Sequence, residues 1–126
     1  MEKKHSIQRT KLIIALLISL TLAACKKEVP KPTPNQLVGK WISGTEYYKY
    51  NADFTGKTWD TKDDVTEDEG KKFTWNLSDF TLTQNHIIDI SDSVTILKSY
   101  TITELTGTKL SYKDAFEKKY SFTKAE

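Results

Sequence analysis

Cysteine and histidine are scarce in this 126-residue chain. Cys25 is its only cysteine, so no internal disulfide can form and the core must hold by packing alone. Zinc sites need several histidine or cysteine ligands, and the chain has only two histidines, His5 and His86. A serine–histidine–acid triad beyond residue 24 would have to use His86, which follows Gln84 and Asn85 in a predicted turn. We therefore expect no enzyme activity, no catalytic or metal site and no cofactor.

Proline is confined to one stretch, residues 26–36, with the sequence KKEVPKPTPNQ. Alternating prolines favour an extended polyproline II conformation, at about 3.1 Å per residue. This stretch is thus expected to be a stiff spacer on the order of 30 Å long. Residues 37–126 contain no proline and are enough for one folded domain but not for two.

A clustered excess of positive charge is also lacking. The chain has 19 basic and 17 acidic residues, but four of the basic and one of the acidic residues lie within the first 24. Residues 25–126 therefore carry 15 basic and 16 acidic side chains, which gives a net charge of −1. Nucleic acid binding needs a clustered basic surface, so we expect no nucleic acid partner.

The N-terminus has the layout of a secretory signal. Residues 1–11 carry four basic side chains against one acidic side chain, and residues 12–22, LIIALLISLTL, are almost purely apolar. A membrane-spanning helix needs about 20 apolar residues, and this run is shorter and is soon followed by Lys26 and Lys27. We therefore expect residues 1–24 to be a signal peptide rather than a lasting transmembrane anchor.

The segment Leu22-Ala23-Ala24-Cys25 resembles the bacterial lipobox, in which small residues precede an obligatory cysteine. The resemblance implies a lipoprotein in which Cys25 becomes the first residue and carries a diacylglycerol and an N-terminal acyl group such as palmitate. Several acyl chains bind a membrane firmly, because each buried CH₂ contributes about 0.8 kcal/mol. Lys26, instead of the aspartate associated with inner-membrane retention in enteric bacteria, favours the outer membrane. Residues 25–36 would then be the lipidated cysteine and its spacer.

Residues 37–126 alternate with a period of two rather than 3.6, which indicates strands. Phe73, Trp75 and Leu77, for example, share one face of the run 72–78. Turn-forming residues separate such runs, mostly every 8–12 residues, as in an antiparallel sandwich or barrel. We expect eight or nine strands, near residues 38–43, 45–51, 54–61, 71–78, 79–85, 86–91, 94–105, 107–113 and 117–124.

Two motifs resemble the lipocalin and calycin barrels. Leu37-Val38-Gly39-Lys40-Trp41 resembles their G-x-W opening, and residues 48–56 are similar to the second hairpin of small bacterial lipocalin-like lipoproteins. The resemblance implies an all-β fold for residues 37–126: an eight-stranded antiparallel up-and-down barrel with Trp41 plugging its closed end. Phe54 departs from the pattern, because such proteins commonly have glycine at this place in the turn.

One stretch of the domain is strongly acidic and ends at Gly70. A calcium loop places oxygen ligands at alternating positions around a central glycine, and this stretch lacks that register. We interpret it as a solvated loop between strands, the longest connection of the domain, which overhangs one mouth of the barrel. Its acidic residues are Asp60, Asp63, Asp64, Glu67, Asp68 and Glu69.

Two functions stay open for the domain. Lipocalins hold a small apolar molecule inside the barrel, so the resemblance favours a small hydrophobic ligand. The expected ligand-contacting side chains, which we place in the barrel interior, are Trp59, Trp75, Tyr100 and Tyr112. Because the inward side chains are bulky, a filled core would instead suit a structural or protein-interaction module with a partner in the cell envelope. An empty apolar pocket would distinguish the first function from the second.

Overall fold

The computed structural model describes residues 28–88, 91 and 93–126. The expected signal peptide, Cys25 and Lys26 lie outside these residues. The chain divides into two units, Met1–Pro30 and Lys31–Glu126, and the second is the folded domain. Within the described residues, no helix has both the length and the apolar character that crossing a membrane requires.

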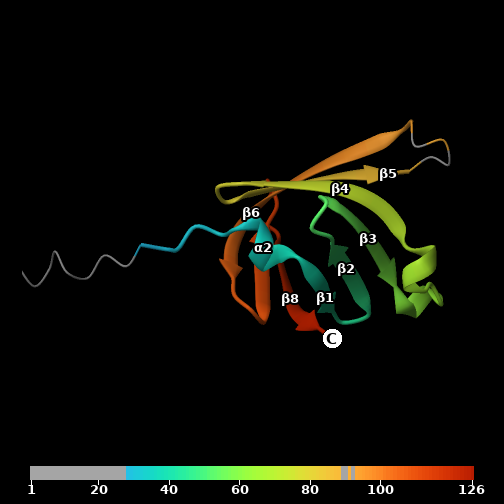
Figure 1. The fold of residues 1–126 in the computed structure, drawn as a ribbon, viewed down its shortest axis with the longest axis horizontal. Coiled ribbons are helices and arrows are strands. Elements are labelled where there is room, and N and C mark those ends of the chain that lie inside the picture. Colours follow the sequence, from blue (N-terminus) through green and yellow to red (C-terminus); the bar gives the residue numbers. More distant parts are fainter. Residues whose placement is uncertain (1–27, 89–90, 92) are drawn as a thin grey trace, which may run out of the picture. The chain divides into compact units, whose positions relative to one another are not determined.

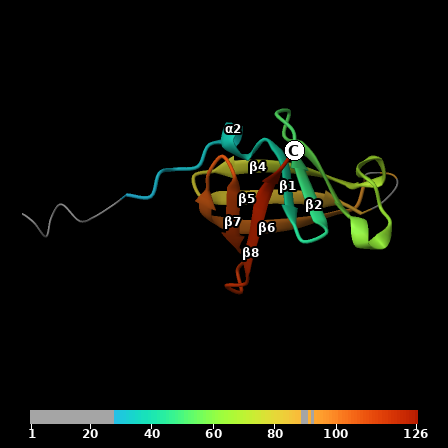
Figure 2. The ribbon, with the colours of Figure 1, turned by 90° about the horizontal axis from the view of Figure 1, so that it is seen from below.

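The domain is a closed barrel of eight antiparallel strands (Figures 1 and 2). Each strand pairs with the next one along the chain, and β1 also pairs with β8, which closes the barrel. The eight-stranded up-and-down barrel predicted from the sequence is confirmed. Its strands are β1 (Gly39–Ser43), β2 (Glu46–Tyr50), β3 (Thr55–Asp60), β4 (Lys71–Ser78), β5 (Thr81–Ile87), β6 (Thr95–Leu105), β7 (Lys109–Lys113) and β8 (Lys119–Ala125).

Strand β5 joins two of the strands expected from the sequence. The runs 79–85 and 86–91 were expected to be separated by a turn at Gln84, Asn85 and His86, and this prediction is wrong. Gln84 pairs with Trp75 and His86 with Phe73, so the alternation continues through polar residues. Both side chains are buried inside the barrel, where a polar pattern in the sequence had indicated solvent.

A short helix, α2 (Pro34–Leu37), precedes β1. Thr33 and Gln36 form a capping box, in which the Gln36 side chain accepts a hydrogen bond from the Thr33 backbone N–H at 2.9 Å. Pro34 occupies the first helical turn, where its missing N–H costs nothing. The end of the predicted extended spacer is therefore a helical turn, and it places Leu37 in the core with no exposed surface.

Trp41 plugs the end of the barrel at which α2 lies, as the resemblance implies. Its side chain is fully buried, and its indole Nε1 donates a hydrogen bond to the Leu37 carbonyl at 2.8 Å. The Lys124 ammonium lies 4.5 Å from the centre of the Trp41 ring and donates to the Val38 carbonyl at 2.6 Å. Burial lowers the pKa of Lys124. We call this part of the molecule the closed end.

Aromatic side chains fill the barrel interior. They contact one another at centroid distances such as 4.4 Å for Tyr100 with Tyr112 and 5.4 Å for Tyr50 with Phe73. Gly56 on β3 makes room for this packing, because a Cβ there would lie 2.4 Å from the Phe73 ring and 2.5 Å from the Lys49 carbonyl oxygen. The inward aromatic residues are Trp41, Tyr48, Tyr50, Phe73, Trp75, Tyr100, Tyr112 and Phe122.

Candidate functional site

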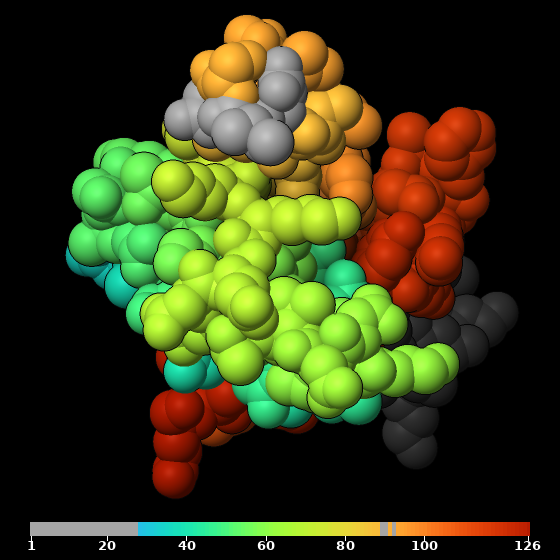
Figure 3. All heavy atoms as spheres, turned by 90° about the vertical axis from the view of Figure 1, so that its right-hand side faces the viewer, coloured from blue at the N-terminus to red at the C-terminus, as the bar shows by residue number. Residues whose placement is uncertain are grey.

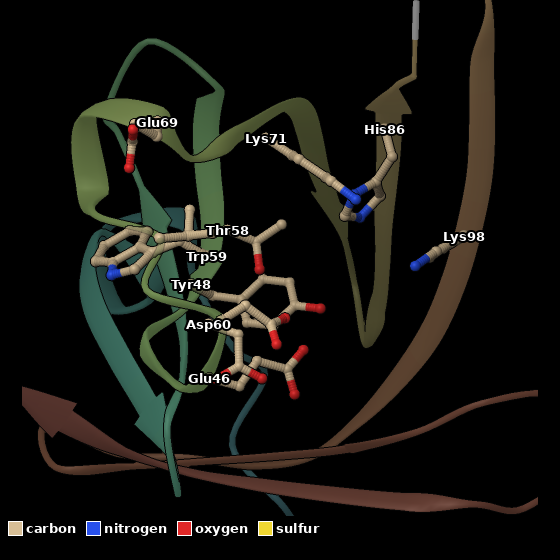
Figure 4. A pocket seen from close by; sticks show the side chains of 11 residues that line it. Glu46, Tyr48, Thr58, Trp59, Asp60, Glu69, Lys71, His86 and Lys98 are labelled. Atoms are coloured by element: carbon tan, nitrogen blue, oxygen red, sulfur yellow. The ribbon is translucent and has the colours of Figure 1, made fainter.

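A pocket of about 350 Å³ opens at the end of the barrel opposite to α2 (Figure 4). We call this end the mouth. β2, β4 and β6 begin there, and β3 and β5 end there, so five strands bring side chains together that lie far apart in the sequence. Seven of the eleven lining side chains are acidic or basic groups. The lining residues are Glu46, Tyr48, Thr58, Trp59, Asp60, Asp63, Val65, Glu69, Lys71, His86 and Lys98.

The acidic side of the pocket is built on β2 and β3. Glu46 pairs with Asp60 across the two strands, so both carboxylates share the face of Tyr48 and Thr58 (Figure 4). Asp60 also caps the short helix η1 (Thr61–Asp63), accepting a hydrogen bond from the Lys62 amide at 2.9 Å. Hydrogen bonds from the Thr45 side chain and the Lys62 amide lower the pKa of Asp60, which keeps the carboxylate charged.

The basic side of the pocket is built on β4, β5 and β6. Lys71 begins β4, Lys98 lies on β6, and His86 lies between them on β5 (Figure 4). Among the described residues, neither Lys71 nor Lys98 forms an ion pair. The two ammonium groups are therefore available to an anionic group that enters the mouth.

His86 is neutral at pH 7. Its side chain is only 7% exposed, and its ring stacks on Phe73 at a centroid distance of 5.1 Å. Burial, and then the charges of Lys98 and Lys71, lower the pKa of His86 to about 4. At neutral pH it therefore contributes hydrogen bonding, and no charge, to the pocket.

A chain of hydrogen bonds connects the pocket with the core. Gln84 is fully buried, its Nε2 donates to the Tyr50 hydroxyl at 2.7 Å, and its Oε1 lies 2.7 Å from His86 Nε2. Because an amide oxygen only accepts, His86 Nε2 must carry the proton and donate. The neutral ring then keeps an unprotonated Nδ1. The pair of hydrogen bonds satisfies the buried amide and fixes the tautomer of His86.

The acidic connection between β3 and β4 overhangs the mouth, as expected. Asp63, Val65 and Glu69 from this segment line the pocket. Glu67, at the start of the second short helix η2 (Glu67–Glu69), forms ion pairs with Lys49 and with Lys40, the latter at 2.8 Å. These two lysines lower the pKa of Glu67 to about 2. No group of three or more potential metal ligands gathers within the described residues.

Three of the four predicted ligand-contacting residues point into the barrel interior but do not line the pocket. Trp75, Tyr100 and Tyr112 are buried in the core, and the Trp75 indole donates to the Thr55 carbonyl at 3.0 Å. Burial raises the pKa of Tyr100 to about 12 and that of Tyr112 further, so both phenols stay neutral. Their contact with a ligand stays a prediction.

The placement of Trp59 in the interior is wrong. Trp59 pairs with Tyr47, whereas the inward residues Tyr48 and Thr58 pair with each other, so Trp59 lies on the outer face of β3. Its ring stacks on Tyr47 at 5.0 Å, and the Lys40 ammonium lies 5.8 Å from it. Neighbouring side chains bury it from outside, and it is the one of the four predicted ligand-contacting residues that lines the pocket.

Three charged residues of the pocket, Glu46, Lys71 and Lys98, were missed in the sequence. They look like solvated strand residues, and only the register of the strands shows that they meet. His86 was detectable, because Leu82, Gln84 and His86 alternate with Thr81, Thr83 and Asn85. Comparisons with family models, with curated proteins and with solved structures find no match to this chain.

Proposed function

We propose that the protein is a lipid-anchored lipoprotein of the bacterial cell envelope that binds a small charged molecule at the mouth of its barrel. The anchor is supported by the lipobox-like residues 22–25 and the short apolar run before them. Binding is supported by one observation above all. The barrel is filled with side chains up to the mouth, and the pocket there has about 350 Å³, within the range of small-molecule sites.

The lining favours a charged ligand over the apolar one that the resemblance implies. An apolar molecule over Lys71, Lys98 and Glu46 would strip water from charged groups without replacing their hydrogen bonds, which is costly. A polar ligand restores those interactions, and bonds to charged groups are the stronger ones. A hydrophobic ligand enclosed in the lipocalin manner would also have to displace the packed aromatic core.

The two signs of charge lie on opposite sides of the pocket (Figure 4). Glu46 and Asp60 suit a cationic group, and Lys71 and Lys98 suit a carboxylate or phosphate. A small zwitterion, such as an amino acid or a short peptide, therefore matches the pocket best. His86 is neutral at pH 7, and its unprotonated Nδ1 accepts a hydrogen bond, so it suits a donor group of such a ligand rather than its anionic group.

The filled interior also supports a second candidate, a structural or protein-interaction module of the envelope. In that case the pocket at the mouth would hold water, and ligands of every charge type would leave the protein unchanged. The binding experiment below separates the two candidates.

Ligand binding is tested with the mature chain, residues 25–126 carrying Cys25→Ser, by calorimetric titration with dipeptides, free amino acids and a fatty acid. We expect a zwitterionic ligand to bind, and Lys71→Met or Glu46→Gln to weaken its affinity about tenfold or more, because bonds to charged groups contribute roughly 1.5–3 kcal/mol. Lys72→Met is the matched control, since Lys72 pairs with Lys57 on the outer face. Binding of the fatty acid alone, insensitive to Lys71→Met, would contradict the proposal.

The anchor is tested separately on the full chain expressed in a Gram-negative host. We expect the protein to sediment with membranes and to carry a mass increase corresponding to a diacylglycerol and an acyl chain. Cys25→Ser should abolish both, and Cys25→Ala should do the same. A protein that stays in the membrane fraction after either substitution has another anchor.

A further inference from the structure

The first half of β6 has a neighbour on one side only. β6 pairs with β5 from Thr95 to Thr101, but its pairing with β7 begins only at Thr101, opposite Lys113. The hairpin of β5 and β6 therefore extends past the end of β7 (Figure 1). Figure 3 looks onto this part of the molecule, and the orange hairpin and the red turn between β7 and β8 stand apart at their outer ends. We call residues Thr95–Ser99 the open edge.

The hydrogen-bond pattern shows which backbone groups face the open side. The Ile88 amide donates to the Val94 carbonyl at 3.0 Å, and the Ile102 amide donates to the Phe80 carbonyl at 2.7 Å. In an antiparallel ladder the bonding direction alternates, so the even-numbered residues of β6 face β5. Thr95, Leu97 and Ser99 then direct their N–H and C=O groups to the open side, where no strand pairs with them within the described residues.

The side chains of the open edge are unusually apolar for an unpaired strand. Ile96 is 48% exposed and Leu97 is 68% exposed, on opposite faces of the sheet. Proteins commonly protect free edges with prolines, bulges, charges or short strands, because an exposed apolar edge attracts another strand. The open edge carries one charge, Lys98, which forms no ion pair with the described residues. Its exposed apolar side chains and unpaired backbone are the features of an edge that binds another strand.

We propose that the open edge binds an extended segment of a partner protein, which adds a strand beside β6. Such a strand would take up the free N–H and C=O groups of Thr95, Leu97 and Ser99, and its side chains would alternate between the two faces. An acidic residue opposite Lys98 would form an ion pair with its ammonium group, which has no ion-pair partner among the described residues. Ile96 and Leu97 call for apolar residues opposite them, in the next two positions of an antiparallel partner.

A second copy of this chain fits the open edge less well. A two-fold antiparallel pairing centred on Leu97 would satisfy the same backbone groups. It would also place the two Lys98 side chains diagonally on the same face, and like charges on neighbouring strands are destabilising. The charge of the edge thus favours a partner of different sequence that supplies an acidic side chain. This inference shares Lys98 with the ligand site proposed for the mouth, and otherwise it rests on the backbone groups of the open edge.

The test uses residues 25–126 with Cys25→Ser and the blocked peptide Thr-Thr-Glu-Val-Val-Thr-Thr, whose glutamate lies opposite Lys98 in antiparallel register. Amide hydrogen exchange is followed by NMR at millimolar peptide. We expect the amides of Thr95, Leu97 and Ser99 to exchange rapidly in the free protein and at least tenfold more slowly with peptide. The amides of Ile96 and Lys98 bond to β5 and serve as internal controls.

Three variants make the result specific. Leu97→Pro removes an N–H that faces the open side and leaves the ladder to β5 intact, so we expect a folded protein that no longer protects its edge. Leu97→Thr keeps the amide and should keep binding. Lys98→Glu should lose the glutamate peptide and bind the peptide in which lysine replaces glutamate. Unprotected edge amides at millimolar peptide would overturn the proposal. Protection that rises with protein concentration alone would overturn it in favour of a second copy.

Discussion

The closed end and the mouth of this barrel are built from different chemistry. At the closed end Leu37 and Trp41 have no exposed surface, and the ammonium of Lys124 is held by the Val38 carbonyl and the Trp41 ring. At the mouth Lys71 and Lys98 form no ion pair with the described residues. The closed end is therefore packed and satisfied internally, whereas the mouth leaves these two ammonium groups without an ion-pair partner among the described residues.

The polypeptide also enters at the closed end. Lys31, where the domain begins, forms an exposed ion pair with Asp79 in the turn between β4 and β5, at 2.8 Å. A pair this exposed contributes little stability.

The largest difference between the two ends is expected from Trp41→Ala. Replacing a fully buried tryptophan by alanine leaves a cavity and removes the hydrogen bond to Leu37, so we expect a loss of about 3–5 kcal/mol. Lys71→Met at the mouth should change the free energy of unfolding by no more than about 0.5 kcal/mol. Urea unfolding followed by fluorescence of the remaining tryptophans measures both. Equal effects would show that the two ends are not divided in this way.

Gly56→Ala probes the packed interior between the two ends. The added Cβ would meet the Phe73 ring and the Lys49 carbonyl oxygen, so we expect a loss of about 1–3 kcal/mol. Combining it with Phe73→Leu should cost less than the sum of the two single effects, because the smaller side chain vacates the space. Gly107→Ala is the control, since nothing lies within 4 Å of a Cβ there. Strict additivity would locate the strain at the Lys49 backbone instead.

The sequence predicted the barrel better than it predicted the mouth. Strands with apolar inward residues, such as Phe73, Trp75 and Leu77 on β4, show in the sequence both the period of two and the face that is buried. On β5 the inward residues Gln84 and His86 are polar, and their two side chains hydrogen-bond to each other. Gln84 also donates to the Tyr50 hydroxyl on β2, and this contact between strands cannot be read from local alternation.

Trp59 shows the converse case, an apolar residue that lies on the outer face of the barrel. It is the only large apolar residue of β3, so placing it inward was the natural interpretation. The inward positions include Gly56 and Thr58, and Phe73 occupies the space beside Gly56. Tyr47 and Lys40 cover Trp59 from outside. A strand whose inward residues are small gives no local sign of its orientation.

As the pH falls, protonation of His86 at the mouth should lower the stability before protonation of Glu67, which pairs with Lys40 and Lys49, does so. The pKa of His86 is lowered from 6.5 to about 4, so the unfolded chain binds its proton more readily, and stability should fall as the pH drops from about 6.5 to 4. The pKa of Glu67 is lowered from 4.5 to about 2, so its contribution is present above 4.5 and is lost between 4.5 and 2.

The two windows are separated by measuring urea unfolding at pH 7.5, 5 and 3. His86→Gln should remove the decline between pH 7.5 and 5, and Glu67→Gln should remove most of the further decline towards pH 3. The Lys98→Met variant should narrow the His86 window by raising its lower end, because the loss of a nearby positive charge raises the pKa of His86 in the folded protein. A decline between pH 7.5 and 5 that persists in His86→Gln would assign it to other groups.

The smallest expected effect concerns Phe54, the residue that departs from the glycine pattern, in the turn between β2 and β3. Its φ is 65°, in the left-handed region that glycine adopts without strain and other residues adopt at a cost of about 1–2 kcal/mol. Its ring packs on Trp75 at 5.0 Å, and such an aromatic pair contributes about 0.5–1.5 kcal/mol. The two terms nearly cancel, so Phe54→Gly should change stability little. Phe54→Ala keeps the strain and loses the contact, so it should be about 1 kcal/mol less stable than Phe54→Gly. If alanine and glycine prove equal in thermal and urea unfolding, the turn has relaxed to negative φ, and the contact with Trp75 alone keeps phenylalanine at this position.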